Sequence, residues 1–197
     1  MHLHFMPIKI IMKYLLIHEK DAQVSNWSGG CTTQLYIYPE SSEYKKRNFK
    51  YRLSMAVAFE EFSTYTSLPG VERHLISLEN KAIVSHNGKY DVCLEPYKIV
   101  DVFDGGWETT AQGKIKDFNL MTANGAKGKM QVFDEETVFC YEMNCHHAFY
   151  IGEGQAQVNG INLNKGDLLL IYEIGDDERL EVKENQNSKI IYCSISL

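Results

Sequence analysis

Two arginines in the first half of the chain could together bind a small carboxylate. Arg52 and Ser54 lie two residues apart in an alternating segment, so their side chains would point the same way on a strand. Arg73 occupies a comparable position in a second alternating segment. Guanidinium groups offer planar, paired donors to a carboxylate, and a hydroxyl such as that of Thr33 or Ser54 can complete the contacts. The structural alternative is that Asp117 pairs with one arginine and closes the end of a barrel.

Other residues of the same region could surround such a site. Trp27 precedes two glycines that would let backbone N–H groups approach a ligand, or it begins a bend that packs the indole over a barrel mouth. Asp117 and Asn119 would share one strand face and could orient a ligand amide or an arginine. His74 could transfer a proton near neutral pH, although a hydrogen-bonded, partly buried histidine is the commoner case. We therefore predict a ligand site formed by Trp27, Thr33, Arg52, Ser54, Arg73, His74, Asp117 and Asn119.

The elements that must position these residues are β-strands. Residues 49–58 alternate cleanly between an apolar face and a face of polar or small side chains. Asn87-Gly88 and Asn159-Gly160 are typical of type I′ hairpin turns. The pattern predicts an all-β chain of short strands, arranged as a sandwich or barrel.

A faint internal repeat predicts two related β units. Ala-x-Val precedes each Asn-Gly turn, at residues 82–84 and again at residues 156–158. We expect a first unit at residues 12–125, which carries the site, and a second, mainly structural unit at residues 126–197. Residues 1–11 would then be an N-terminal extension.

The charge and cysteine content argue against several classes of partner. A net charge of −6 over 197 residues disfavours nucleic acid and anionic membrane surfaces. Five irregularly spaced cysteines favour free thiols in a reducing cytosol over a disulfide framework. The apolar stretch at residues 8–17 is too short to span a bilayer, and no cleavage site follows it. We expect a cytoplasmic protein that binds neither nucleic acid nor membranes.

Four motifs occur in an order that resembles the HutD/Ves family of bacterial proteins. They are Trp27-Ser28-Gly29-Gly30-Cys31-Thr32-Thr33, Tyr51-Arg52-Leu53-Ser54-Met55-Ala56, Phe62-Ser63 with Leu68-Pro69-Gly70-Val71-Glu72-Arg73, and Asp117-Phe118-Asn119-Leu120-Met121. The resemblance implies a double cupin, in which two RmlC-like jelly-roll barrels (double-stranded β-helices) pack together. It implies no established catalytic activity. The HutD branch implies histidine utilisation and a small acidic ligand such as N-formylglutamate, the Ves branch implies stress or cold responses, and the motifs fit both.

Many cupins bind a metal through a His-x-His pair, a glutamate and a later histidine, and this chain departs from that pattern. In the second unit, Phe149 and Leu169 stand where two of the histidines belong. Too few ligands remain, because catalytic sites keep at least three. In the first unit, Glu72-x-His74 mimics the front of the motif, but residues 90–103 contain no histidine. We expect no metal and no cofactor.

Three functions fit these features. The first is a non-catalytic binder or sensor of a small carboxylate-bearing metabolite, which we favour over an enzyme. The second is a metal-free isomerase or lyase that transfers a proton with His74 and either Asp117 or Glu72, an idea that rests on analogy of fold. The third is a protein-interaction or regulatory module, or a homodimer, formed through an exposed sheet edge such as residues 189–197.

Overall fold

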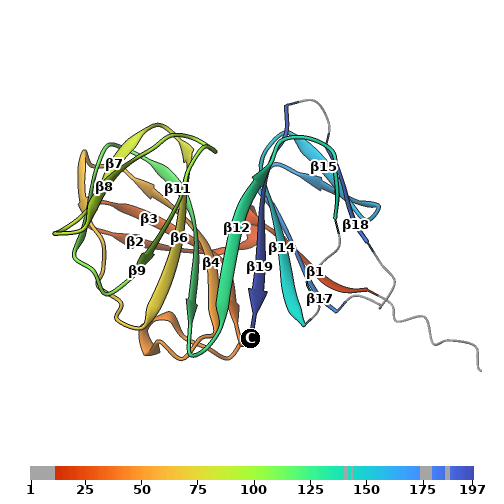
Figure 1. Ribbon diagram of the computed structural model, residues 1–197, viewed down its shortest axis with the longest axis horizontal. Coiled ribbons are helices and arrows are strands. Elements are labelled where there is room, and N and C mark those ends of the chain that lie inside the picture. Colours follow the sequence, from red (N-terminus) through yellow and green to blue (C-terminus); the bar gives the residue numbers. More distant parts are fainter. Residues whose placement is uncertain (1–11, 140–141, 143, 174–178, 185–186) are drawn as a thin grey trace, which may run out of the picture.

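The described chain consists of β-strands joined by turns, with two single-turn 3-10 helices, η1 (Glu19–Asp21) and η2 (Tyr44–Lys46). A computed structural model describes residues 12–139, 142, 144–173, 179–184 and 187–197. The expected extension at residues 1–11 lies outside that part. The strands form four antiparallel sheets (Figure 1), which confirms the all-β prediction.

The first unit contains two of these sheets. Its six-stranded sheet has the order β2-β3-β4-β11-β6-β9, and its four-stranded sheet has the order β5-β10-β7-β8. The strands are β2 (Gln23–Trp27), β3 (Gly30–Tyr38), β4 (Tyr51–Ala58), β5 (Phe62–Thr64), β6 (Val71–Glu79), β7 (Ala82–His86), β8 (Tyr90–Leu94), β9 (Val100–Asp104), β10 (Thr109–Gln112) and β11 (Lys116–Ala123).

The second unit contains the other two sheets. The orders are β1-β17-β14-β19-β12 and β13-β18-β15-β16. The strands are β1 (Lys13–His18), β12 (Lys127–Phe133), β13 (Thr137–Phe139), β14 (Cys145–Glu153), β15 (Gln155–Val158), β16 (Ile161–Asn164), β17 (Asp167–Glu173), β18 (Leu180–Glu184) and β19 (Lys189–Ser196).

Two features of the second unit differ from the sequence-based expectations. The first strand of the chain, β1, pairs with β17 and so joins the second unit, where Leu16 lies opposite Leu169. Residues 13–18, which we expected in the first unit at residues 12–125, therefore belong to a sheet of the second unit. The division of the chain into two units at residue 125 stays a prediction. The expected sheet edge at residues 189–197 is wrong, because β19 pairs with β14 on one side and β12 on the other.

The four sheets stack in one direction, and three sets of apolar contacts hold the stack together. One cluster fills the space between the two sheets of the first unit, and a second fills the space between those of the second unit. A third joins the six-stranded sheet to the five-stranded sheet, so the two units pack face to face (Figure 1). Tyr51, Leu53 and Met55 of β4 belong to this third cluster. Since side chains alternate along a strand, Arg52 and Ser54 point into the first unit.

Both Asn-Gly hairpins form, but only one has the expected turn. Asn159 and Gly160 both have positive φ, 45° and 81°, as a two-residue type I′ turn requires. In the other hairpin His86 pairs with Tyr90, which leaves a three-residue loop with Gly88 alone at positive φ. A two-residue turn would have paired His86 with Lys89, so the strand pairing of β8 is shifted by one residue.

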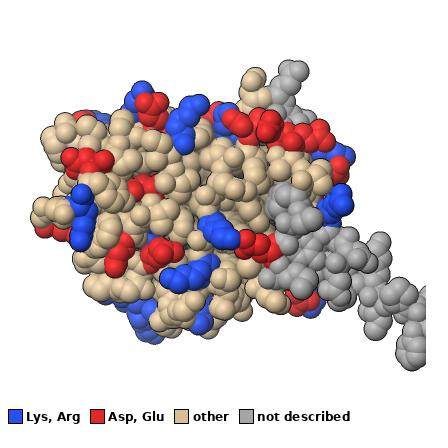
Figure 2. Space-filling view, viewed as in Figure 1, with Lys and Arg blue, Asp and Glu red and all other residues tan. Residues whose placement is uncertain are grey.

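One face of the molecule carries side chains of both charges (Figure 2), and the described cysteines form no disulfide. Basic and acidic side chains are interspersed on the face in Figure 2. Cys31, Cys93, Cys145 and Cys193 are free thiols, while Cys140 lies outside the described residues. In the described part of the chain, no helix has the length and apolar character needed to cross a membrane.

Candidate functional site

The register of the six-stranded sheet brings several predicted site residues together on its inner face. Met121 on β11 lies directly opposite Arg52 on β4 and Arg73 on β6. In the next row, Asn119 lies opposite Ser54. Directly opposite residues of antiparallel strands point to the same side of a sheet, and diagonal neighbours stay within reach of long side chains. The two arginines, Ser54 and Asn119 therefore face one region between the sheets of the first unit.

Arg52 is held by neutral partners. Its Nε donates to Oε1 of Gln34 at 2.8 Å, and Nη1 donates to Oγ of Ser54 at 3.0 Å. The ring of Tyr44 covers the guanidinium at 4.5 Å from the ring centroid. Only 5% of the residue is exposed, and this burial lowers the pKa of Arg52 to about 10, an effect that Tyr44 opposes and Arg73 increases.

Arg73 is equally buried and has fewer polar contacts. Its guanidinium lies 4.8 Å from the ring centroid of Tyr65 and 5.2 Å from that of Phe103. Its Nε has no hydrogen-bond partner among the described residues. Burial lowers the pKa of Arg73, and the nearby Tyr65 and Asp117 oppose that shift. Within the described chain neither Arg52 nor Arg73 forms an ion pair, so the structural alternative of an Arg–Asp pair is not found.

Asp117 and Asn119 complete the polar cluster on β11. Asp117 lies one row beyond Asn119, opposite Ala56, and its burial raises the pKa of the carboxyl to about 7 although Arg73 acts in the opposite direction. The carboxyl therefore keeps its proton to a higher pH than an exposed aspartate does. Oδ1 of Asn119 and the hydroxyl of Tyr65 are buried without a hydrogen-bond partner among the described residues. We name Arg52, Ser54, Tyr65, Arg73, Asp117 and Asn119 the arginine cluster.

Two predicted residues, His74 and Thr33, lie on the opposite face of the same sheet. His74 is opposite Leu120, which packs between the units, and its imidazole approaches the backbone of Gly128. Thr33 is opposite Met55, another residue of that packing cluster. Both side chains therefore point away from the arginines.

Trp27 lies at the flank of the first unit, on the edge strand β2. Its indole N–H donates to Oγ1 of Thr32 at 3.2 Å, and the ring lies over Gly29 and Gly30. A Cβ at Gly30 would lie 1.9 Å from the carbonyl oxygen of Val57. The indole therefore packs on its own turn, and no hydrogen bond or cation–π contact joins Trp27 to Arg52 or Arg73 among the described residues.

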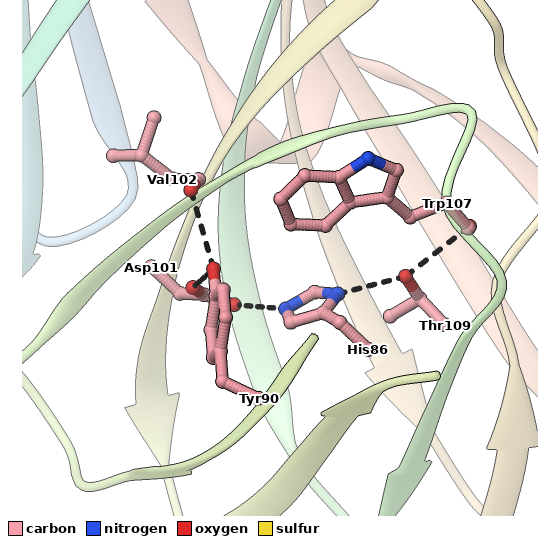
Figure 3. A network of polar contacts seen from close by, with 6 residues as sticks. All are labelled: His86, Tyr90, Asp101, Val102, Trp107 and Thr109. Atoms are coloured by element: carbon pink, nitrogen blue, oxygen red, sulfur yellow. Dashed lines mark hydrogen bonds and ion pairs between the residues drawn. The ribbon is translucent and has the colours of Figure 1, made fainter. Parts of the chain in front are cut away.

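A second polar network adjoins the arginine cluster and was missed by the sequence analysis (Figure 3). The imidazole of His86 lies between Oδ2 of Asp101 and Oγ1 of Thr109, 2.9 Å from each, and Tyr90 donates to Oδ1 of Asp101 at 2.8 Å. Phe103 joins the two groups, because its ring lies 4.4 Å from His86 and 5.2 Å from the Arg73 guanidinium. No sequence spacing indicates this network, which arises from the pairing of separate strands.

Two surface hollows lie away from the arginine cluster. One, of about 480 Å³, adjoins the β7–β8 hairpin, and one, of about 290 Å³, lies against β5 and β10. Neither is lined by Arg52, Arg73 or Asn119. The buried cluster is a better candidate site than the hollows, because its charges are desolvated and incompletely paired. A ligand there must be small, or the half-buried rings of Tyr44 and Tyr65 must move to admit it.

The interior of the second unit is mainly apolar, and the buried His147 beside it is hydrogen-bonded to the hydroxyl of Tyr192. Phe149 and Leu169, the residues at expected metal-ligand positions, are fully buried and lie directly opposite each other. Neither side chain offers a ligand atom. Within the described residues, no three His, Cys, Asp or Glu side chains are grouped closely enough to hold a metal ion. The expectation of no metal or cofactor stays a prediction.

The stacked antiparallel sheets place the protein among cupin-fold proteins. Its structure is similar to that of YhhW from Escherichia coli, with a TM-score of 0.69, 9% identity, and coverage of 92% of this chain and 97% of that one. The model of the HutD family matches residues 19–191. The chain belongs to the HutD family.

Two further solved structures share the fold. HutD from Pseudomonas fluorescens SBW25 has a TM-score of 0.78 and 19% identity, and the match covers 93% of this chain and 98% of that one. The conserved protein PA5104 from Pseudomonas aeruginosa PAO1, whose function is unknown, has a TM-score of 0.81 and 16% identity, with coverage of 94% and 100%. A comparison with curated proteins finds no sequence match. At these identities the likeness shows the fold.

Proposed function

We propose that this HutD-family protein is a cytoplasmic, non-catalytic binder or sensor of a small carboxylate metabolite in amino-acid or histidine metabolism or in a stress response. In this proposal each unit is a cupin barrel, and the ligand lies inside the first. The observation that carries the proposal is the pair of buried arginines, Arg52 and Arg73, which have no ion-pair partner among the described residues.

The electrostatics of the cluster favour an anion. A charge taken out of water without a partner is unfavourable by several kcal/mol, so two neighbouring guanidinium groups oppose folding until an anion joins them. Asp117 offsets only part of this charge near neutral pH, because the pKa of its carboxyl is raised to about 7. A carboxylate ligand would supply the missing negative charge and accept paired hydrogen bonds.

The alternatives have less support. The side chains of His74 and Asp117 point to opposite faces of one sheet, and the second candidate, Glu72, shares with His74 the face that is turned away from the arginine cluster. An interaction module that uses residues 189–197 loses its basis, since β19 is an inner strand. No specific observation favours either function.

The test is a titration of the full chain with small carboxylates, followed by calorimetry. The panel contains formate, acetate, N-formylglutamate and urocanate; formate is included because the HutD structure from P. fluorescens is described for a formate condition. We expect at least one to bind, and Arg52→Gln or Arg73→Gln to weaken binding about tenfold or more.

Arg47→Gln is the matched control, because Arg47 is exposed and outside the cluster. It should bind as the unchanged protein does. Absence of binding to every carboxylate, or equal binding by the Arg52 and Arg73 variants, contradicts the proposal.

A further inference from the structure

Three buried polar atoms of the arginine cluster have no hydrogen-bond partner among the described residues: Nε of Arg73, Oδ1 of Asn119 and the hydroxyl oxygen of Tyr65. Buried polar groups are nearly always satisfied, so three such atoms in one region require an explanation. The two other buried atoms without partners, on His74 and Thr122, belong to the opposite face of the sheet. If the proposed carboxylate site is correct, the donor and acceptor types of these three atoms indicate which carboxylates it binds.

The three atoms surround one region. Asn119 lies two residues along β11 from Met121, which is opposite both Arg52 and Arg73, so Asn119 is the diagonal neighbour of each arginine. The Tyr65 ring covers Arg73 at 4.8 Å from the guanidinium. A single small molecule beside Arg73 would therefore reach the other two groups.

The donor and acceptor types of these atoms define what that molecule must offer. Nε of Arg73 is a donor, and a carboxylate oxygen satisfies it. Oδ1 of Asn119 is an acceptor, which a carboxylate cannot satisfy because it has no proton to donate. The Tyr65 hydroxyl can donate or accept. A simple carboxylate would thus leave Asn119 unsatisfied, whereas a hydroxyl beside the carboxylate could donate to Asn119 and accept from Tyr65.

We propose that the ligand is a carboxylate whose adjacent carbon carries a hydrogen-bond donor, of which the α-hydroxycarboxylates are the smallest members. Asn119 is the specificity-determining residue, and Arg73 binds the carboxylate. The burial of Arg52, Arg73, Asp117 and Asn119 favours a ligand of a few carbon atoms.

Matched pairs of ligands test this inference on the unchanged full-length protein. Glycolate differs from acetate, and lactate from propionate, by one hydroxyl on the carbon next to the carboxylate. Titration at one pH and one ionic strength should give a dissociation constant about tenfold lower for the hydroxylated member of each pair. Equal dissociation constants within both pairs would overturn the inference.

An Asn119→Leu variant tests the assigned residue. It removes the acceptor at similar volume, so acetate should bind within about threefold of the unchanged protein while the preference for glycolate falls to about twofold or less. Asn162→Leu, at an exposed position in the second unit, is the control and should keep the full preference. An undiminished glycolate preference in a folded Asn119→Leu protein would assign the donor contact elsewhere and overturn the role of Asn119.

The two proposals fail in different ways. If neither acetate nor glycolate binds, the carboxylate site itself is contradicted. If acetate binds and glycolate binds no more tightly, the carboxylate site stands and only the ligand class inferred here is overturned; that result would mean that water satisfies Asn119.

Discussion

Arg52 and Arg73 lie on either side of Met121 in one row of the six-stranded sheet, and both point between the sheets of the first unit. Each is almost completely buried, and the charge on Arg73 contributes to the lowered pKa of Arg52. Two like charges in this position oppose folding, because they lose hydration and repel each other. Such an arrangement is typical of a site that is completed by a ligand of opposite charge.

Replacement of each arginine by methionine should therefore have unequal effects on stability. For Arg73→Met we expect the free energy of unfolding to be unchanged or higher by about 1–2 kcal/mol, because a poorly paired buried charge is removed. Arg52→Met should lower it by about 1–2 kcal/mol, since the hydrogen bonds to Gln34 and Ser54 are lost. Urea unfolding followed by tryptophan fluorescence measures both. If Arg73→Met lowers the free energy of unfolding more than Arg52→Met does, Arg73 is the better-paired residue.

The sequence was sufficient to predict the all-β fold and to show which residues of β4 share a face. Alternation in residues 49–58 identified β4 and placed Arg52 and Ser54 on one face. It could not identify which face is interior, because both are buried: the arginine face lies within the first unit and the apolar face packs on the second. Alternation shows which side chains share a face of a strand. The packing of the sheets decides what each face contacts.

Strand pairing and the packing between the units separate some of the predicted site residues from the arginine cluster. Thr33 and His74 belong to the correct strands but to the face between the units. Gln34, which accepts a hydrogen bond from Arg52, was missed because it lies on another strand, and its place opposite Ser54 depends on the pairing of β3 with β4. The contact of His86 with Asp101 joins separate strands, and single-strand periodicity contains no information on that pairing.

The network around His86 should contribute strongly to the stability of the first unit. His86→Leu removes the imidazole contacts to Asp101 and Thr109, and we expect the free energy of unfolding to fall by about 3–5 kcal/mol. Tyr90→Phe removes one hydrogen bond to Asp101 and should lower it by about 1–2 kcal/mol. The exposed Tyr14 provides the control, since Tyr14→Phe should change the free energy of unfolding by less than about 0.5 kcal/mol.

A double-mutant cycle separates this network from simple loss of volume. Because His86 and Tyr90 share Asp101, the two changes should be non-additive by about 0.5–3 kcal/mol. Additive effects within about 0.3 kcal/mol would argue that the two residues act independently.

The position of β1 in the second unit can be tested at Leu16. This side chain packs against the apolar cluster of the second unit and lies opposite Leu169. We expect Leu16→Ala to lower the free energy of unfolding by about 2 kcal/mol and to speed amide hydrogen exchange in β17. Tyr14→Ala, on the same strand but half exposed, should change it by less than about 1 kcal/mol. Faster exchange in β4 with none in β17 would place β1 with the first unit.

Asp117 should make the protein less stable as the pH rises. Burial raises the pKa of its carboxyl from 3.8 to about 7, so the folded state binds the proton more tightly than the unfolded state. The resulting stabilisation is complete below about pH 4 and is lost as the pH rises through about 7. We expect Asp117→Asn to raise the free energy of unfolding by up to about 4 kcal/mol at pH 8 and to have little effect at pH 4. Urea unfolding at both pH values measures this difference, and an equal effect at both would contradict a raised pKa.

The affinity for a carboxylate ligand should depend on whether the Asp117 carboxyl is protonated. Below about pH 7 the Asp117 carboxyl is neutral, and above it the charge competes with the ligand for Arg73. Tyr65 and Asp101 also face this guanidinium, and they remain in place in an Asp117→Asn variant. We therefore expect the dissociation constant for a bound carboxylate to rise about tenfold between pH 6 and pH 8. In Asp117→Asn it should stay nearly constant over that range. Calorimetric titration at several pH values, at constant ionic strength, measures both proteins, and an unchanged pH dependence in the variant would assign the titrating group to another residue.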